Sequence, residues 1–406
     1  MINIVGLGYI GLPTALMFAK SGVEVVGTDY NKELVENLNA GKLTFEEAGL
    51  NKLFNEALNN NIEFKTEYVR SDIYILAVPT PYVSESKKID PKYVISSLNS
   101  VLDVCEKGSI IVIESTISPG TIDRFVRPEI NKRGFIIGKD VHIVHAPERI
   151  IPGNMIYELE NNSRTIGVDD KEIGEKVKEL YESFCSGEIV VTDIRSAEMS
   201  KVVENTYRDI NIAFANELAK ICRTDGMDVY EIIKIANKHP RVNILQPGPG
   251  VGGHCISVDP WFLVGDYPDL TNIILTARKI NDSMPNHVLS RIRDIMREHN
   301  IKDIGKIGLY GLTYKEDVDD VRESPTLQLL EKMDEHLAFG VKVYDPFVKE
   351  RIVEHQFINF EDFLNEIEVV VILVGHTHIK ENIELIKGKL ILDTKNISNI
   401  KDAYRL

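Results

Sequence analysis

The chain opens on a short apolar stretch followed by three glycines in the spacing Gly6-x-Gly8-x-x-Gly11. Gly6 permits a tight turn, Gly8 lets a pyrophosphate approach the backbone, and Gly11 lets a helix pack closely on a strand. The surrounding pattern predicts a strand at residues 2–5, a helix ending at Lys20 and a second strand at residues 23–28. A chain that begins in this way is constrained to open with a βαβ dinucleotide-binding unit, whose helix N-terminus supplies amide donors to the phosphates.

Asp29 ends the second predicted strand. An acid at this place accepts hydrogen bonds from both ribose hydroxyls and repels a 2′-phosphate, which favours NAD over NADP as the cofactor. Three glycines in this spacing are by themselves weak evidence for a nucleotide site. A nucleotide site is nevertheless the preferred interpretation, because a strand precedes the glycines, a helix follows them and Asp29 ends the next strand.

The alternation of strands and helices continues, and polar residues follow several of the predicted strands. Strands at residues 73–78, 110–113 and 141–145 lead into Thr80, Thr116 and the pair Glu148-Arg149, respectively. Ligands of open parallel sheets lie beyond the carboxyl ends of the strands, so these residues are candidates for a site. Local turn capping is the alternative for the threonines, and a surface ion pair is the alternative for Glu148. We expect this NAD-binding domain to cover residues 1–192.

The composition limits the class of partner. A chain of 406 residues predicts two to three domains, and a net charge of -15 argues against nucleic acid or an anionic membrane. The four cysteines form no CxxC pair, which predicts neither a disulfide framework nor a metal site. Because no secretion signal or membrane-spanning apolar run is found, we expect a cytoplasmic protein.

The middle of the chain is predicted to be helical, from residue 193 to residue 300. A long helix over residues 196–224 places Lys201, Asn205 and Arg208 on one face. Such a stripe suits either a solvated surface or a site for an anionic sugar nucleotide. A helix follows at 229–238, and another at 271–300 has Pro285 at a bend or break. Long helices between two α/β halves suggest a dimer interface.

Residues 243–260 are the most unusual stretch, because four glycines and two of its three prolines come shortly before His254 and Cys255. Glycines at this density let the backbone turn sharply and expose bare N–H groups to a ligand. We therefore expect this loop to hold a phosphorylated ligand whose reacting carbon Cys255 attacks. The alternative is a tight turn with a buried, inert thiol.

Residues 301–406 predict a second Rossmann-like unit, with strands at 306–310, 341–344, 369–374 and 390–392. This unit lacks GxGxxG, so we expect no second dinucleotide there. Lys315 and Arg322 lie among acids in the loop after its first strand, either as a solvated salt-bridge network or with Lys315 on a phosphate. The predicted fold is thus α/β, with two Rossmann-like doubly wound parallel-sheet domains joined by a central helical segment.

The motifs GLGYIGLP, VPTP, EST, APER, EMSKVVENTYRDINIAFANE, PGPGVGGHC and YKEDVDDVRESP cover essentially the whole chain. With them the chain resembles the UDP-glucose/GDP-mannose dehydrogenase superfamily. The resemblance implies an NAD-dependent enzyme that oxidises C6 of a UDP-sugar to a carboxylate and acts as a homodimer or higher homo-oligomer. The runs YRDINIAFANEL and HPRVNILQPGPGVGGHCISVDPWF imply UDP-N-acetyl-D-mannosamine as the substrate.

The same resemblance assigns roles to individual residues. Cys255 is implied as the nucleophile and Lys201 as the general base or acid, with Glu148 and Asp259 as acids near the reacting carbon. The implied NAD contacts, besides the three glycines, are Tyr9, Ile10, Asp29, Thr80, Thr116 and Arg322. The implied substrate contacts, besides Lys201, are Arg149, Ile150, Asn205, Arg208, His239, Arg241, Gly252, Tyr314 and Lys315.

A four-electron oxidation must retain a reactive aldehyde while the cofactor is exchanged, and a thiolate achieves this as a thiohemiacetal that is oxidised to a thioester. Three alternatives stay open. The first is the same chemistry on UDP-N-acetylglucosamine or UDP-glucose. The second is a two-electron NAD oxidoreductase in which Cys255 is structural, and the third is a silent nucleotide-binding module.

Overall fold

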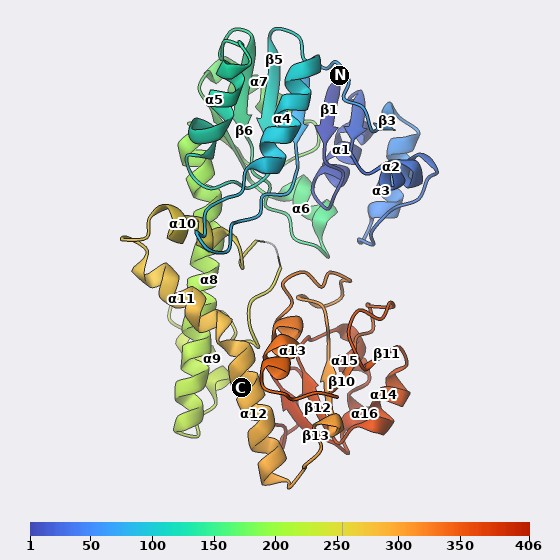
Figure 1. Cartoon of the computed structure of the whole chain (residues 1–406), viewed down its shortest axis with the longest axis vertical. Helices are drawn as coiled ribbons and strands as arrows, with labels where there is room; N and C mark the ends of the chain where they lie inside the picture. The colour runs from blue at the N-terminus through green and yellow to red at the C-terminus, as the bar shows by residue number, and fades with distance from the viewer. Residues whose placement is uncertain (254) are drawn as a thin grey trace. The chain divides into compact units, whose positions relative to one another are not determined.

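The computed structural model describes residues 1–253 and 255–406, so His254 of the glycine-rich loop lies outside the described residues. The chain divides into two compact units, drawn in Figure 1. Unit 1 consists of Met1–Glu204 and Trp261–Asp266, and unit 2 of Asn205–Pro260 and Tyr267–Leu406. The residues expected to form a central helical domain are therefore shared between the two units.

Unit 1 is built on an eight-stranded sheet in the order β3-β2-β1-β4-β5-β6-β7-β8. Its strands are β1 (Ile2–Val5), β2 (Val25–Thr28), β3 (Ile62–Lys65), β4 (Ile73–Leu76), β5 (Ser109–Ile113), β6 (Val141–His145), β7 (Arg164–Val168) and β8 (Ile189–Thr192). The first six are parallel, in the strand order of dinucleotide-binding folds. Strand β3 was not among the strands predicted from the sequence.

One junction of this sheet differs from the prediction of a wholly parallel sheet. Strand β7 pairs antiparallel with β6, Val144 opposite Val168 and His145 opposite Gly167, and β8 is parallel to β7. The chain returns from β6 through the short helix α6 (Met155–Asn161). An antiparallel neighbour needs no crossover helix, whereas a parallel one does.

The helices of unit 1 bury the sheet and carry the glycine motif. They are α1 (Gly11–Lys20), α2 (Lys32–Asn39), α3 (Leu50–Leu58), α4 (Lys92–Val104), the π-helical turn η1 (Ile122–Val126), α5 (Arg127–Lys132), α6 and α7 (Lys171–Glu182). Helix α1 is buried from Gly11 to Ala19 because nearly all of its side chains are apolar or small. That burial fixes its N-terminus at the carboxyl end of β1.

The central region has helices at each of the predicted places and one further helix, α10, that was not predicted. They are α8 (Ile194–Thr224), α9 (Val229–Ala236), α10 (Asp259–Asp266), α11 (Asn272–Asp282) and α12 (Met284–Glu298). The predicted helix 271–300 is broken at Ser283, and Pro285 stands in the first turn of α12, where a missing N–H costs nothing. Among the described residues, no helix is both long enough and apolar enough to cross a membrane.

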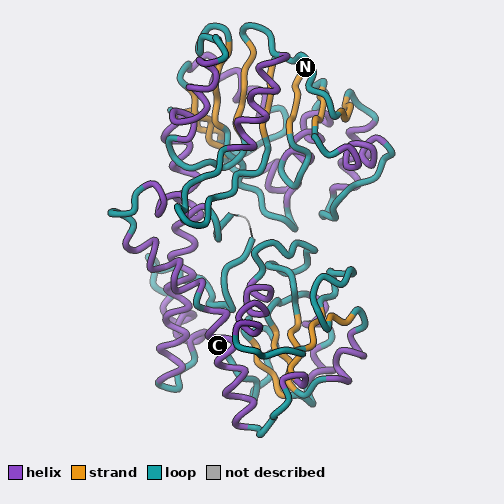
Figure 2. Tube along the Cα trace, in the orientation of Figure 1, coloured by secondary structure: helices purple, strands orange, loops and turns teal. Residues whose placement is uncertain are grey.

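Unit 2 contains a five-stranded parallel sheet in the order β11-β10-β9-β12-β13. Its elements are the 3₁₀ turn η2 (Ile304–Lys306), β9 (Ile307–Tyr310), α13 (Pro325–Glu335), β10 (Lys342–Tyr344), β11 (Gln356–Phe357), α14 (Phe360–Glu366), β12 (Val369–Ile372), α15 (Thr377–Glu381), α16 (Ile383–Ile386) and β13 (Leu390–Asp393). Figure 2 shows the strands of each unit bordered by helices. The predicted fold class, two Rossmann-like halves joined through helices, is confirmed.

Candidate active site

The glycine loop after β1 has the geometry of a dinucleotide cradle. Gly6 has a φ of +91°, and a Cβ atom there would lie 2.4 Å from the carbonyl oxygen of Ala77. A Cβ on Gly11 would lie 1.8 Å from the carbonyl oxygen of Gly6, whereas one on Gly8 would meet nothing within 4 Å. Two glycines are thus required by packing, and the third leaves the backbone open to an approaching ligand.

Asp29 stands beside this loop at the end of β2. Its Oδ2 accepts a hydrogen bond from the backbone N–H of Leu7 at 2.8 Å, and its Oδ1 accepts one from Asn31 at 2.9 Å. Tyr9 and Ile10 follow Gly8 and are half-buried. The carboxylate is therefore oriented by the same backbone that forms the cradle, and each of its oxygens retains a further lone pair.

The segments after β4 and β5 are joined through two hydroxyl groups. Thr80 Oγ1 donates to the carbonyl oxygen of Thr116 at 2.6 Å. Ser115 Oγ donates to the carbonyl oxygen of Val78 at 2.7 Å and accepts from its N–H at 2.8 Å. Ser115 was not singled out from the sequence, although its position directly after a strand was the available signal.

Glu148 belongs to a buried cluster of charges. The antiparallel register of β6 and β7, continued beyond the strands, places Glu148 opposite Arg164, and the two form an ion pair. Glu114 accepts a hydrogen bond from the Tyr181 hydroxyl at 3.0 Å and lies 3.9 Å from the Arg164 guanidinium. One arginine thus faces two carboxyl groups. Arg164 could not be identified from the sequence, because it lies in an otherwise mostly apolar strand.

Burial and, to a smaller extent, the charge of Glu148 raise the pKa of Glu114 to about 8, against the opposing effect of Arg164. Folded Glu114 therefore keeps a proton that an unfolded glutamate, with a pKa of about 4.3, has lost. The protonated Glu114 therefore contributes stability in full below a pH of about 4.3, and this contribution is lost as the pH rises towards 8. We expect Glu114→Gln, which mimics the neutral acid, to raise the melting temperature relative to wild type more at pH 8 than at pH 5.

Thermal unfolding at the two pH values measures this difference. The exposed Glu67 offers a control, because Glu67→Gln should shift the melting temperature equally at both. A pH-independent effect of Glu114→Gln would show that Glu114 is ionised in the folded protein.

Arg149 and Ile150 follow Glu148. The Arg149 guanidinium contacts both carboxylate oxygens of Glu204 at 2.9 Å and donates to the carbonyl oxygen of Ser163 at 2.8 Å. Ile150 is buried. Arg149 is thus held on the first part of α8 and is not a solvated side chain.

The predicted stripe on α8 is only partly buried. Lys201 and Asn205 are 5% and 4% exposed, respectively, whereas Arg208 is exposed. Among the described residues of unit 1, no carboxylate forms an ion pair with the Lys201 ammonium group.

The glycine-rich loop of unit 2 lies directly on the segment that follows β9. A Cβ atom on Gly252 would lie 2.5 Å from the carbonyl oxygen of Glu323, and one on Gly253 would lie 2.8 Å from the Tyr314 ring. The N–H of Gly253 donates to the carbonyl oxygen of Arg322 at 3.1 Å. Glycine is therefore required at both positions by close contact with the segment after β9.

Cys255 is exposed, which argues against the alternative of a buried, inert thiol. Its carbonyl oxygen accepts hydrogen bonds from the N–H groups of Val258 at 3.2 Å and Asp259 at 2.9 Å, so the cysteine begins a helical turn that leads into α10. Asp259 is 3% exposed, and its Oδ2 accepts from Asn205 Nδ2 at 2.6 Å. Three residues implied in the chemistry are thereby joined within unit 2.

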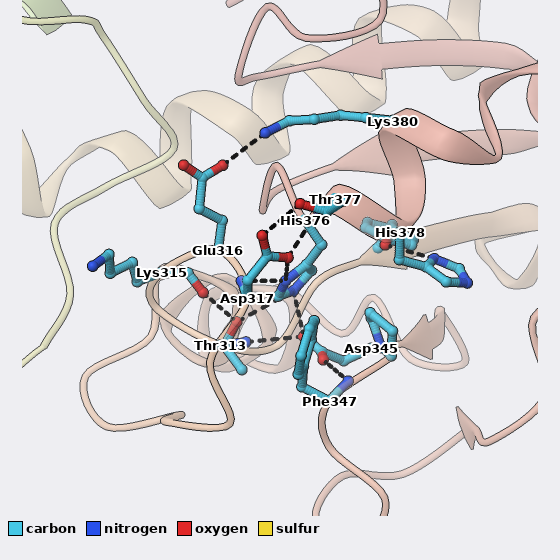
Figure 3. A network of polar contacts seen from close by, with 12 residues as sticks. Thr313, Lys315, Glu316, Asp317, Asp345, Phe347, His376, Thr377, His378 and Lys380 are labelled. Atoms are coloured by element: carbon cyan, nitrogen blue, oxygen red, sulfur yellow. Dashed lines mark hydrogen bonds and ion pairs between the residues drawn. The ribbon is translucent and has the colours of Figure 1, made fainter. Parts of the chain in front are cut away.

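A polar network holds the loop that carries Tyr314 and Lys315, and Figure 3 shows it at the carboxyl ends of β9, β10 and β12. Asp345 Oδ2 accepts from the N–H groups of Leu312 at 2.6 Å and Thr313 at 3.2 Å. Burial alone would raise the pKa of Asp345, but its hydrogen bonds lower it below the usual value. The loop is thus fixed by a buried carboxylate.

His376 completes this network and is fully buried. Its Nδ1 accepts from the backbone N–H of Asp317 at 2.9 Å, so the proton lies on Nε2, which faces Asp345 Oδ2 at 3.2 Å. Neither Asp345 nor His376 was identified from the sequence. Asp345 directly follows β10 and His376 lies four residues after β12, and these places beyond strand ends were the signal that could have found them.

The remaining predicted residues lie at the surface. His239 and Arg241 are exposed after α9, where the Arg241 N–H faces His239 Nδ1 at 3.3 Å. Arg322 forms a bidentate pair with Asp320, at 2.8 Å and 2.6 Å. An arginine expected to contact NAD is thus paired with a carboxylate of its own loop.

Three models of one family match the chain in succession. They describe the UDP-glucose/GDP-mannose dehydrogenase family: its NAD binding domain matches residues 1–185, its central domain residues 195–283, and its UDP binding domain residues 308–400. The matches place the cradle after β1 in the NAD binding domain and the network of Figure 3 in the UDP binding domain.

Individual relatives are similar over nearly their full length. The UDP-N-acetyl-D-mannosamine dehydrogenase of Methanococcus vannielii is 44% identical, covering 98% of this chain and 93% of its own. The NDP-N-acetyl-D-galactosaminuronic acid dehydrogenase of Ralstonia nicotianae is 37% identical, covering 98% and 96%. The solved UDP-N-acetyl-mannosamine dehydrogenase of Staphylococcus aureus is 42% identical, with a TM-score of 0.89 over 100% of this chain and 97% of that one.

Proposed function

Because the chain belongs to the UDP-glucose/GDP-mannose dehydrogenase family, we propose that it oxidises the C6 hydroxyl of UDP-N-acetyl-D-mannosamine to a carboxylate. The family assigns it to the NAD-dependent nucleotide-sugar dehydrogenases, as the motifs implied. The proposal adds the sugar, the four-electron course and the thiol chemistry. One observation carries it: an exposed cysteine leaves a glycine loop that lies against the UDP-binding half.

The residues of unit 1 fit NAD. Gly8 presents open backbone at the N-terminus of α1, and Asp29 is oriented beside it, as a pyrophosphate and a ribose require. Thr80 lies after β4 and Thr116 lies after β5. When bound, NAD accepts a hydride from the sugar carbon at each of two oxidation stages.

Lys201 is proposed to transfer the proton, and Cys255 is proposed to act as the nucleophile. Lys201 takes the proton of the C6 hydroxyl as the alcohol becomes an aldehyde, and its positive charge stabilises the oxyanion. The Cys255 thiolate adds to the aldehyde carbon and holds it as a thiohemiacetal, whose oxidation gives a thioester. Water cleaves the C–S bond, releasing the carboxylate and restoring the thiol. Asn205, Asp259 and Glu148 are proposed to orient the sugar or the water.

The nucleotide half of the substrate is assigned to unit 2. Tyr314 and Lys315 are proposed to hold the phosphates, on the loop that Asp345 and His376 support. Arg149, Ile150, Arg208, His239, Arg241 and Gly252 are the other proposed substrate contacts, and Tyr9, Ile10 and Arg322 the other NAD contacts.

The deciding experiment incubates the protein with NAD and a panel of UDP-sugars that includes N-acetylmannosamine, N-acetylglucosamine, N-acetylgalactosamine and glucose. Two NADH per sugar and an acidic product from the manno isomer are expected. One NADH per sugar would leave Cys255 a structural residue. If another UDP-sugar of the panel is oxidised preferentially, that sugar is the substrate instead. Absence of turnover would favour a silent binding module.

Cofactor selection gives a prediction for Asp29. The wild-type enzyme should prefer NAD, and Asp29→Asn should reduce the ratio of kcat/KM for NAD to that for NADP by about tenfold or more. The substitution removes the charge that repels a 2′-phosphate, while an amide oxygen still accepts a hydrogen bond. Asp225→Asn, at an exposed position after α8, is the control. A wild-type preference for NADP would contradict this role.

We also propose a homodimer in the cytoplasm. Tyr207, Phe214 and Ile221 recur every seven residues on α8 and are 63%, 49% and 51% exposed, the spacing of an apolar stripe that pairs with a second helix. Sedimentation should show a dimer for wild type and a monomer for Phe214→Glu. Glu217→Gln, at an exposed neighbour, should stay dimeric. A monomeric wild-type protein would refute the homodimer.

A further inference from the structure

A buried polar chain in unit 2 connects the two ends of the glycine-rich loop. It consists of Asp209 and Asn216 on α8 and Arg278 and Asn281 on α11, which we call the polar clamp. All four side chains are at most 2% exposed. None of them was singled out from the sequence, and none has a role in the proposed chemistry.

At one end, the clamp holds the beginning of the loop. The N–H of Gly248 donates to Asn216 Oδ1 at 2.9 Å. Asn216 Nδ2 in turn donates to Asn281 Oδ1 at 2.9 Å, and Asn281 Nδ2 donates to Asp209 Oδ1 at 2.7 Å. Each of the two amides therefore accepts one hydrogen bond through its oxygen and donates one through its nitrogen, so the donors all point from Gly248 towards Asp209.

At the other end, the clamp reaches the residue after Cys255. Arg278 Nη1 donates to Asp209 Oδ1 at 2.6 Å and faces the carbonyl oxygen of Ile256 at 3.4 Å. Arg278 also forms an ion pair with Asp282 on its own helix. The guanidinium thus connects the charge of Asp209 with the backbone of the turn that begins at Cys255.

A contribution to folding stability does not by itself explain why these four polar residues are buried together. Burying an arginine and an aspartate has a large desolvation cost, and apolar residues of similar volume often stabilise a core equally well or better. What apolar residues cannot do is accept from the N–H of Gly248 and donate to the carbonyl of Ile256. The clamp makes both hydrogen bonds, one on each side of the segment that carries Cys255.

We infer that Arg278, with Asp209, Asn281 and Asn216 behind it, positions the Cys255 turn for attack on the sugar. This inference rests on the proposed function for its kinetic consequence. Arg278 is a positioning residue, because it acts through the backbone at Ile256. A displacement of about 1 Å in a reacting group costs up to about a hundredfold in rate, so a small shift of this turn is sufficient.

Arg278→Lys tests the inference. A lysine keeps the charge opposite Asp209, but one ammonium group on a flexible stem does not reproduce the planar fork, whose Nη1 serves Asp209 and the Ile256 carbonyl while its Nη2 pairs with Asp282. We expect kcat to fall about ten- to a hundredfold, with the KM for the UDP-sugar and the Kd for NAD within about threefold of wild type. Arg293→Lys, at an exposed position on α12, is the matched control and should change none of these.

Hydrogen exchange gives a second readout that needs no turnover. Backbone amides of Val258 and Asp259 should exchange at least about tenfold faster in Arg278→Lys, while those of β9 and β12 keep their protection. If Arg278→Lys does not fold, Asn216→Ala, which removes the acceptor for Gly248, should show the same kinetic split.

Two outcomes would overturn the inference: a folded Arg278→Lys with wild-type kcat and wild-type exchange, or faster exchange throughout unit 2. If wild type oxidises no UDP-sugar but the turn still loosens selectively in Arg278→Lys, the proposed function fails and the structural part of the inference stands.

Discussion

Replacing Cys255 by serine is expected to lower formation of the carboxylate product by at least about a thousandfold, as loss of a catalytic nucleophile does in other enzymes. Cys255 is exposed on a turn whose backbone is hydrogen-bonded at Val258 and Asp259. A serine fits this turn, so the effect is chemical. A hydroxyl at neutral pH is a far weaker nucleophile than a thiolate, and no thioester can form from it.

The first oxidation does not require the sulfur atom. The serine variant should therefore produce up to one NADH per sugar, slowly, and release aldehyde or retain it. Counting NADH against sugar consumed and identifying the product by mass spectrometry distinguishes these stages. Cys105→Ser, at a half-buried position after α4 in unit 1, is the control and should turn over normally. Normal carboxylate release by Cys255→Ser would refute the nucleophile.

Replacing Lys201 by alanine is expected to lower kcat by about two to four orders of magnitude, as removal of a general acid–base does. Lys201 is 5% exposed on α8, four residues before Asn205. Without the ε-amino group, the alcohol proton has no positioned acceptor, and the oxyanion loses the positive charge that the protonated amine would place beside it. Steady-state kinetics with saturating NAD and UDP-sugar measures the change.

A matched control lies on the same helix. Lys220 is partly buried and donates to Ser283 Oγ at 2.9 Å, and Lys220→Ala should leave kcat within about threefold of wild type. The division between kcat and KM decides the role of Lys201. An increase confined to KM would make it a substrate-binding residue, and an unchanged kcat/KM would remove it from the chemistry.

Much of the fold was predictable because each element carries its own local pattern. The apolar runs at β1, β4, β5, β9 and β12 are short and bounded by turn residues, and the structure places a strand at each. Strand β3 was missed because IEFK mixes charged and apolar residues at the edge of a sheet, where only one face needs to be apolar. The reversal at β7 was missed for another reason, since hydrophobic periodicity carries no strand direction.

The candidate site was predictable only where a motif is contiguous. The glycines at positions 6, 8 and 11 and the loop before Cys255 could be read directly, because glycine is required where backbones touch, as at Gly252. Arg164, Arg278 and His376 could not be found in this way. Each of these side chains is buried, and the polar partners that offset the cost of burying it lie on other segments of the chain.

The sequence by itself determined the class of fold, the NAD cradle and the motifs of the family, because these depend on neighbouring residues along the chain. Only the tertiary structure decided which buried ionisable groups face one another: Glu114 and Glu148 with Arg164, and Asp209 with Arg278. The physical reason is that local backbone preference acts over a few residues, whereas the cost of burying a charge is offset only by a partner that folding brings close.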